Sequence, residues 1–219
     1  MAAASLMFAL ILVEGKLSTT QVKDMNNHSD LIEEYFLEQR QILGMVDKLT
    51  LQNAINVILE AYQKNSMIFT CGNGGSAHTA SHYITDWNKM VDVYCNRQFK
   101  GVCLNDNVGN ITAYANDISY EEVFARMLRS YLSKNDLVIM ISGSGNSENL
   151  LQAAKCAKDF GASTLGLIGY DGGKLRGCVD DYLIFPSFDM QLCEDFHLSF
   201  GHIVMKALIS IGVTKNDPR

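Results

Sequence analysis

The chain has 219 residues, of which 47% are hydrophobic, and a mean hydropathy of +0.02. This length suits one α/β domain, and the apolar content is sufficient for a sizeable core, which excludes wholesale disorder. The formal net charge is −6, and there is no block of lysine or arginine. Nucleic acid is therefore not expected as a direct partner.

The first 24 residues form a leader or extension of unclear role, and we expect a single domain over residues 25–219. An apolar run of eight residues at 6–13 is too short to span a bilayer, so no membrane partner is predicted. No positive residue precedes this run and no small-residue cleavage site follows it, which argues against a signal peptide. The six cysteines contain no CxxC pair, which argues against a zinc ribbon and favours a reducing, cytoplasmic location.

Two runs of apolar residues at helical spacing occupy residues 30–64. Thr50 is a candidate N-cap for the second run, and Asn65 is a candidate stop. The pattern predicts a pair of amphipathic helices at the start of the domain.

Short apolar runs then alternate with helical stretches along the rest of the chain. Their almost continuous hydrophobicity is typical of strands that are covered on both faces, and so of a parallel sheet. The alternation predicts an α/β fold with a doubly wound parallel sheet. The expected strands are 67–71, 101–104, 137–142, 163–169 and 181–185, and the expected helices are 77–90, 120–132, 148–160 and 190–211.

Two turns rich in glycine and serine each follow an expected strand and precede an expected helix: GNGGS at residues 72–76 and SGSGNS at residues 142–147. Glycine lets the backbone approach a ligand closely, while serine hydroxyls and helix N-terminal amides donate to anionic oxygens. Neither turn is a P-loop or a GxGxxG motif, so a nucleotide cofactor is not expected. In a doubly wound sheet, two such turns can converge at the carboxyl ends of the strands. The alternative is two ordinary connections that bind nothing.

These turns and their surroundings resemble the sugar isomerase (SIS) domain family, most of all its sedoheptulose-7-phosphate (phosphoheptose) isomerases. The resemblance rests on GNGGSAHTASHYITD, LNDN followed by ANDISYEEVF, ISGSGNSENLLQAAKCAKDFGA, GYDGGKL and EDFHLSFGH. It implies a five-stranded parallel sheet in the flavodoxin-like order 2-1-3-4-5. It also implies an N-terminal helical hairpin that assembles a homotetramer.

The resemblance also implies a binding site for a phosphorylated ketoheptose. The residues implied to hold the sugar phosphate are Ser142, Ser144 and Ser147, and those implied to line the same site are Asn73, Gly74 and Ser76. It further places Asp106 of the LNDN loop at the substrate. Considered alone, Asp106 or Asp117 could simply cap a helix or form an Asx turn.

Aldose–ketose isomerisation needs a base, an acid and a group that stabilises the developing enolate. His82 and Asp86 are four residues apart on an expected helix, so they share a face. Asp195 and His202 share a face of the last expected helix, with Glu194 within reach.

Counting from the motifs, the resemblance places His202 and Asp86 at the positions of the catalytic histidine and glutamate. His82 and Glu194 fall at the other positions of a zinc site, to which Asp86 and His202 also belong. Two of the four depart from the family pattern. Aspartate for glutamate shortens the reach by one methylene, and glutamate for glutamine adds a negative charge. A His/Asp/Glu/His set suits one zinc per subunit with a position open for substrate, without a nucleotide cofactor.

The leading hypothesis is an isomerase that interconverts sedoheptulose 7-phosphate and D-glycero-D-manno-heptose 7-phosphate for lipopolysaccharide or surface-polysaccharide synthesis. The alternatives are a non-catalytic phosphosugar-binding SIS protein that regulates replication initiation, and an isomerase of another phosphosugar. Not every residue with suitable chemistry is expected to act in the site. His78 and His197 are expected to be structural, and Trp87 to pack its helix against the core or a neighbouring subunit.

Overall fold

The computed structural model describes residues 28–212 of the chain. The expected leader at 1–24 lies outside the described residues, so the boundary at residue 25 stays a prediction. Contacts divide the chain into two compact units, one ending at Gln41 and the other beginning at Ile42. The described part of the first unit belongs to helix α3 (Ser29–Met45), in which only Ile42 is buried. No single helix in residues 28–212 has the length and apolarity needed to cross a bilayer; only α3 and α4 counted together do.

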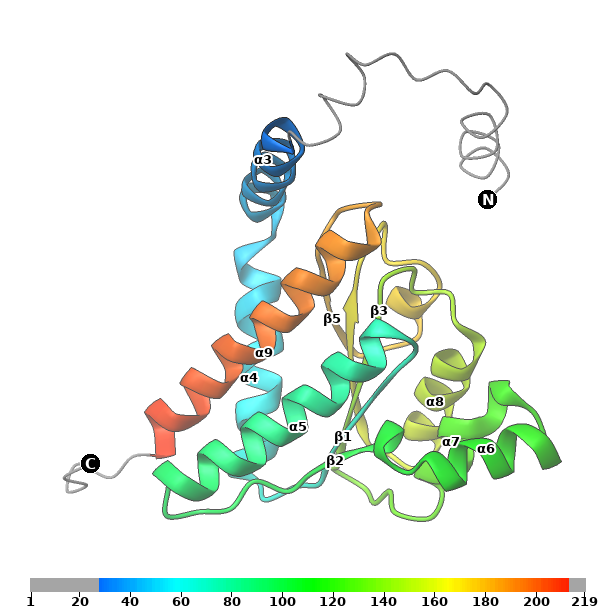
Figure 1. Cartoon of the computed structure of the whole chain (residues 1–219). Helices are drawn as coiled ribbons and strands as arrows, with labels where there is room; N and C mark the ends of the chain where they lie inside the picture. The colour runs from blue at the N-terminus through cyan, green and yellow to red at the C-terminus, as the bar shows by residue number, and fades with distance from the viewer. Residues whose placement is uncertain (1–27, 213–219) are drawn as a thin grey trace, which may run out of the picture. The chain divides into compact units, whose positions relative to one another are not determined.

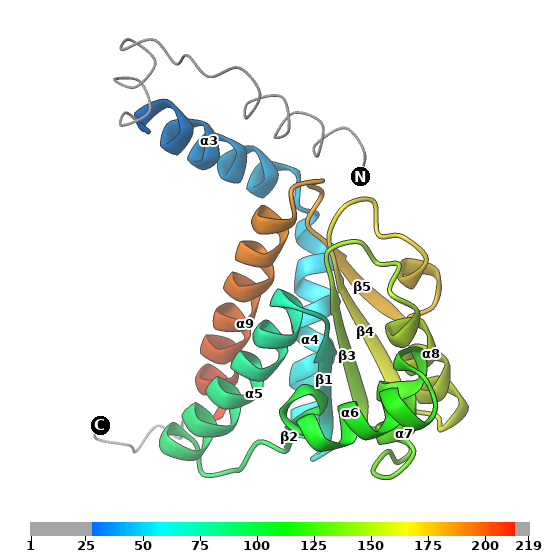
Figure 2. The same ribbon diagram turned by 45° about the vertical axis from the view of Figure 1, so that its right-hand side comes forward.

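The second unit is built on a five-stranded sheet whose pairs are all parallel. The strand order is β2-β1-β3-β4-β5, which confirms the expected flavodoxin-like topology (Figure 2). The ends of the strands differ from the predicted ends by no more than one residue. The strands are β1 (Ile68–Gly72), β2 (Gly101–Cys103), β3 (Leu137–Ser142), β4 (Ser163–Ile168) and β5 (Asp181–Ile184).

Helices cover both faces of this sheet (Figures 1 and 2). One layer contains α4 (Lys48–Gln63), α5 (Gly75–Tyr94) and α9 (Met190–Gly212), and the other contains α6 (Val108–Asp117), α7 (Val123–Leu128) and α8 (Glu148–Asp159). Because the central strands are covered twice, every residue of β1 and β3 is buried. This double cover explains the continuous apolar runs that predicted a parallel sheet.

The segment between β2 and β3 departs most from the predicted elements. Asp106 and Asp117 were expected in loops, but Asp106 ends the short 3-10 helix η1 (Leu104–Asp106) and Asp117 ends α6. Neither aspartate caps α6, because the Asn107 side chain accepts the Asn110 amide at 3.0 Å. The sequence analysis missed α6, a ten-residue helix with no fully buried residue. Its apolar face is short and only partly buried, with Ile111, Tyr114 and Ala115 packed against the core. The expected helix at 120–132 is likewise divided into η2 (Tyr120–Glu122) and the shorter α7.

The ends of α4 show one wrong and one confirmed prediction. Thr50 is not the N-cap; the Asp47 carboxylate caps the helix, accepting from the amides of Leu49 at 2.7 Å and Thr50 at 3.3 Å. An aspartate accepts these first-turn amides more strongly than a hydroxyl would. Asn65 does stop the helix, with a left-handed φ of 62° that asparagine tolerates better than most residues.

A close crossing aligns α5 with α9 over the sheet. Gly201 leaves room for the ring of Tyr83, which a Cβ at this position would overlap. The indole of Trp87 stacks on Tyr83, with ring centroids 4.7 Å apart, and its N–H donates to the Gly201 carbonyl at 2.9 Å. Trp87 therefore packs its helix against the core, as predicted. His82 precedes Tyr83 and His202 follows Gly201, so this contact also brings the two imidazoles together, edge to face with ring centroids 5.2 Å apart.

His197 lies on the core side of α9 and is fully buried. Neither ring nitrogen has a hydrogen-bond partner among the described residues, and the ring meets the edge of Phe185 at 5.6 Å between centroids. Its carbonyl accepts the hydroxyl proton of Tyr83. These contacts agree with the structural role that was expected for this histidine.

Burial lowers the pKa of His197 from 6.5 to about 4. Between these values the unfolded chain binds a proton at His197 that the folded chain does not, so the free energy of unfolding rises with pH. We expect acidification from pH 7 to pH 4.5 to remove about 2 kcal/mol of stability through this residue. Urea denaturation at the two pH values measures the loss, and His197→Gln should show a smaller pH dependence. An equal loss in both proteins would contradict the assignment.

Candidate active site

The first glycine-rich turn connects β1 to α5. Gly74 adopts a left-handed φ of 55° at the N-cap position of α5. The turn is held from the side by Asn105, whose amide accepts the Gly72 N–H at 3.1 Å and donates to the Gly72 carbonyl at 2.9 Å. The LNDN segment thus supports the first turn through its asparagine, a role that sequence reasoning did not assign.

The second turn connects β3 to α8 and uses its own serines to fix its shape. The Ser142 hydroxyl accepts the Gly145 amide at 2.9 Å, and the Ser144 hydroxyl accepts the Asn146 amide at 3.3 Å. Each hydroxyl therefore keeps its proton for another acceptor. Ser147 is the N-cap residue of α8, but its side chain makes no capping hydrogen bond to the helix. All three hydroxyls are consequently able to donate to a ligand.

The GYDGGKL segment supports the second turn from behind. Gly145 has a left-handed φ of 64°, and a Cβ there would overlap the Gly172 carbonyl. The Leu175 amide donates to the Gly145 carbonyl at 2.9 Å, and the Lys174 amide donates to the Asn146 side chain at 3.2 Å. Lys174 thus contributes its backbone to the geometry of this turn.

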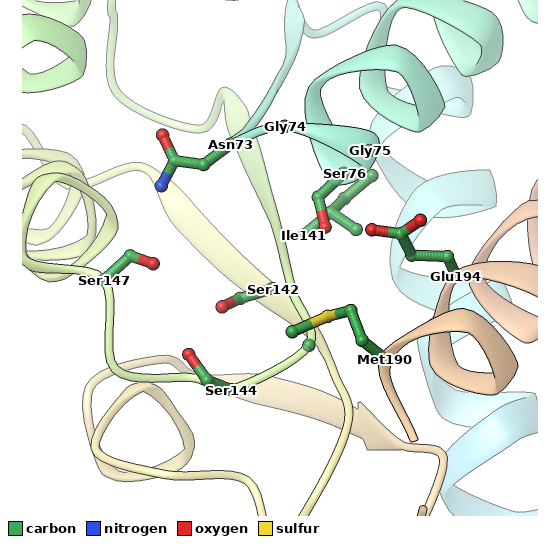
Figure 3. A pocket seen from close by; sticks show the side chains of 11 residues that line it. Asn73, Gly74, Gly75, Ser76, Ile141, Ser142, Ser144, Ser147, Met190 and Glu194 are labelled. Atoms are coloured by element: carbon green, nitrogen blue, oxygen red, sulfur yellow. The ribbon is translucent and has the colours of Figure 1, made fainter. Parts of the chain in front are cut away.

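The two turns open onto one pocket of about 290 Å³ (Figure 3). Figure 3 shows the side chains of Ser142, Ser144 and Ser147 converging on it from one side. The structure thus brings together all but one of the residues predicted to bind substrate. The complete lining is Asn73, Gly74, Gly75, Ser76, Ile141, Ser142, Gly143, Ser144, Ser147, Met190 and Glu194.

Glu194 is the only charged residue in this lining. Its carboxylate lies directly over Gly75, where any Cβ would overlap it. Gly75 is the first residue of α5, so the carboxylate lies at the positive end of that helix, where a negative charge is stabilised.

A second group of predicted site residues lies further along the same two helices. His82 Nε2 lies 3.1 Å from Asp86 Oδ2 and 3.2 Å from His202 Nε2, and His202 Nε2 lies 3.8 Å from Asp86 Oδ2. The side chains of His82 and His202 are 45% and 46% exposed, and that of Asp86 is 27% exposed. These three residues are here called the His–Asp–His cluster.

The His–Asp–His cluster has the chemistry and spacing of a metal site. Its three ligand atoms all lie within 4.8 Å of one another. Ligands about 2.0–2.1 Å from a tetrahedral zinc ion stand roughly 3.3 Å apart, close to the observed spacings. Two imidazoles and one carboxylate are ordinary zinc ligands, and a set of three leaves a fourth position open.

Glu194 was expected among the metal ligands and Asp106 in the substrate pocket, and the structure groups neither of them there. Glu194 lines the pocket and is not one of the three grouped ligands. Asp106, which was expected at the substrate, is exposed and lines a different hollow together with Asn88 and Gly101. The residue of η1 that contacts the first turn is Asn105, the neighbour of Asp106.

The pocket and the cluster are related by the geometry of α5 and α9. His82 follows Gly75 by seven residues, which corresponds to about 10 Å along a helix. His202 follows Glu194 by eight residues, or about 12 Å. The cluster therefore lies about two helical turns beyond the pocket.

Comparison with known proteins identifies the family. The sequence profile of the SIS domain matches residues 34–169. The chain belongs to the SIS domain family. A phosphoheptose isomerase of Aliarcobacter butzleri is 34% identical over 182 residues, which are 82% of this chain and 96% of that protein. One from Helicobacter pylori strain P12 is 36% identical over 178 residues, covering 80% and 92%.

A solved SIS-domain structure gives the same result at the level of the fold. The phosphoheptose isomerase of Neisseria gonorrhoeae superposes with a TM-score of 0.77 and 25% sequence identity. The match covers 84% of this chain and all of that one. The expected fold and the expected enzyme class, an aldose–ketose isomerase with a SIS domain, are confirmed.

Proposed function

We propose that this phosphosugar isomerase interconverts sedoheptulose 7-phosphate and D-glycero-D-manno-heptose 7-phosphate through an enediol. The observation that carries the proposal is the convergence of the two glycine- and serine-rich turns on one pocket. The His–Asp–His cluster, two helical turns away on the helices that flank this pocket, supplies acid–base groups. A phosphomonoester at one end of an extended sugar and a carbonyl at the other end match this arrangement.

The pocket is suited to holding the phosphate group reversibly. Ser142, Ser144 and Ser147 direct hydroxyls toward it, and α8 begins immediately after Ser147. Hydroxyl protons and the N-terminal amides of a helix stabilise phosphate oxygens. The lining contains no lysine or arginine, so the ester is bound by hydrogen bonds and the helix dipole instead of a fixed cation.

We assign the proton transfer of the isomerisation to the His–Asp–His cluster. Asp86 and His202 lie within 3.8 Å of each other and are partly exposed, so both can reach a substrate atom. We assign the removal and return of the carbon-bound proton to this pair, with His82 holding Asp86 in position. A zinc ion held by His82, Asp86 and His202 would polarise the substrate carbonyl, and the Asp86 oxygen that is not a ligand would then remain as the base. We assign Glu194 to contacts with the substrate, because it lines the pocket.

Turnover of purified protein tests the proposal. Incubation with sedoheptulose 7-phosphate should yield an aldose phosphate of the same mass, which is separated by chromatography and identified by NMR. Binding of the sugar without turnover, with and without added zinc, would contradict catalysis and favour a phosphosugar-binding regulator. Turnover of a different ketose phosphate alone would change the substrate but not the reaction.

We also propose a homotetramer in the cytoplasm, with precursors for lipopolysaccharide or other surface polysaccharides as its products. Apolar side chains on α3 that remain exposed to solvent support assembly: Leu31, Ile32, Phe36 and Leu37. Light scattering of the purified chain measures the assembly state, and a monomer at micromolar concentration would contradict it.

Removal of a cluster ligand should strongly weaken metal binding. We expect His82→Ala and Asp86→Asn to weaken zinc binding by more than the roughly 10- to 100-fold that follows loss of an outer-shell partner. Calorimetric titration with zinc measures the affinity. Asp92→Asn on the same helix is the control, because Asp92 is exposed and lies outside the cluster. Equal zinc affinity in all three variants would contradict the assignment.

A further inference from the structure

The two glycine- and serine-rich turns are joined by a reciprocal pair of side-chain amides. Asn73 of the first turn donates from Nδ2 to Asn149 Oδ1 at 2.9 Å, and Asn149 Nδ2 donates to Asn73 Oδ1 at 2.9 Å. Asn149 lies in the first turn of α8 and is only 3% exposed. Since both of its amide atoms bond Asn73, this buried side chain is committed to holding the neighbouring turn.

A third residue completes the set from outside the pocket. The hydroxyl of Tyr120 donates to Asn73 Oδ1 at 2.7 Å. Tyr120 begins η2, 47 residues after Asn73, and is 49% exposed. It is not among the residues that line the pocket, so its hydroxyl acts on the site through Asn73.

These bonds determine which end of the Asn73 amide is available to a ligand. A primary amide has two N–H donors and an oxygen with two lone pairs. The oxygen of Asn73 accepts from both Asn149 and Tyr120, and one N–H is used by Asn149. One N–H donor remains. Figure 3 shows the nitrogen of Asn73 on the side that faces Ser147, with the oxygen turned away.

We propose that Tyr120 and Asn149 are positioning residues that lock the Asn73 amide so that it presents a donor to an anionic oxygen of the phosphosugar. This inference rests on the proposed function and deepens it. Rotation of the amide would place its oxygen against the substrate and would break the bonds to both neighbours. The lock therefore favours ligands that only accept hydrogen bonds, as the oxygens of a phosphate dianion do.

The Tyr120→Phe variant tests this positioning of Asn73. It should disturb the fold little, because it removes only one hydroxyl from a half-exposed ring. Loss of one such hydrogen bond should weaken binding of sedoheptulose 7-phosphate and of inorganic phosphate about fivefold. KM should rise by a similar factor while kcat stays the same. Tyr131→Phe is the matched control, since Tyr131 is 56% exposed and does not line the pocket.

A double-mutant cycle separates positioning from a merely structural effect. If Tyr120 acts through Asn73, then Tyr120→Phe should have no effect on phosphate affinity in an Asn73→Ala background. Asn149→Asp should weaken phosphate binding more than Tyr120→Phe, because it removes a donor from Asn73 Oδ1 and adds a charge beside the site. Circular dichroism and melting temperature verify that each variant is folded.

The outcomes separate this inference from the proposed function. An unchanged phosphate affinity in Tyr120→Phe, or a loss that persists in the Asn73→Ala background, would overturn the lock. Wild-type protein that binds inorganic phosphate without isomerising sedoheptulose 7-phosphate would overturn the proposed function alone, and the cycle on phosphate affinity would still decide the lock. A wild-type chain that binds neither ligand would overturn both.

Discussion

Replacement of His202 by alanine is expected to lower kcat by about 100- to 10,000-fold, the range typical of a lost acid–base group. The imidazole lies 3.2 Å from His82 and 3.8 Å from Asp86, so its removal disrupts both the proton transfer and the metal site. The pocket is bounded by other residues, so affinity for the phosphosugar should stay within a few-fold of wild type. Steady-state kinetics and calorimetric binding measure the two effects separately.

Lys206→Ala is the control for this variant, because Lys206 is exposed one turn further along α9. It should retain wild-type kcat. A His202→Ala protein that keeps more than half of the wild-type kcat would contradict the assignment of His202 to catalysis. A variant that loses phosphosugar binding together with turnover would show instead that His202 supports the pocket.

Gly145→Ala is expected to impair the fold and the phosphate pocket together. Gly145 has a φ of 64°, and a methyl group there would overlap the Gly172 carbonyl. Strain of this kind destabilises a protein by about 1–3 kcal/mol per residue. Relief of the overlap must move the second turn away from GYDGGKL, so phosphate affinity should fall at least about tenfold, as the hydroxyls lose their alignment.

The matched control for Gly145→Ala is Gly177→Ala. Gly177 does not have a left-handed φ, and a Cβ there would meet no atom within 4 Å. Urea denaturation and calorimetric titration with inorganic phosphate should leave Gly177→Ala close to wild type. Equal stability and affinity in the two variants would show that the turn tolerates a side chain at Gly145.

The sheet could be predicted because its signal is local in the sequence. Continuous apolar runs such as 137–142 reflect burial on both faces, and the strand order follows from the family resemblance. The glycine- and serine-rich turns were equally visible, because turns at strand ends of a parallel sheet share one edge. Their convergence on one pocket therefore required no knowledge of side-chain contacts.

The remaining parts of the site depend on contacts between distant segments. Asn149 meets Asn73 across 76 residues, and Tyr120 meets it across 47. Nothing in the local pattern around Asn149 or Tyr120 distinguishes them from ordinary polar residues of a helix surface. The surroundings of Asp106 were hidden for a related reason, since adjacent residues of a 3-10 turn point in different directions and spacing alone could not show that Asn105 contacts the first turn.

The cluster was partly predictable. His82 and Asp86 share a helical face, which sequence spacing gives directly. The approach of His202 depends on the register between α5 and α9, and this register is set by Gly201 against Tyr83. The same register leaves Glu194 beside Gly75, away from the three grouped ligands.

The close contact of Gly201 with Tyr83 holds α5 and α9 in one register. The pocket lies at the start of this helix pair and the His–Asp–His cluster lies about two turns further on, so helical rise sets their separation. One residue inserted between Gly75 and His82 would rotate the His82 side chain by about 100° around the helix axis, away from His202. Under the proposed function, the separation of these two sites limits the length of the sugar chain that can reach both.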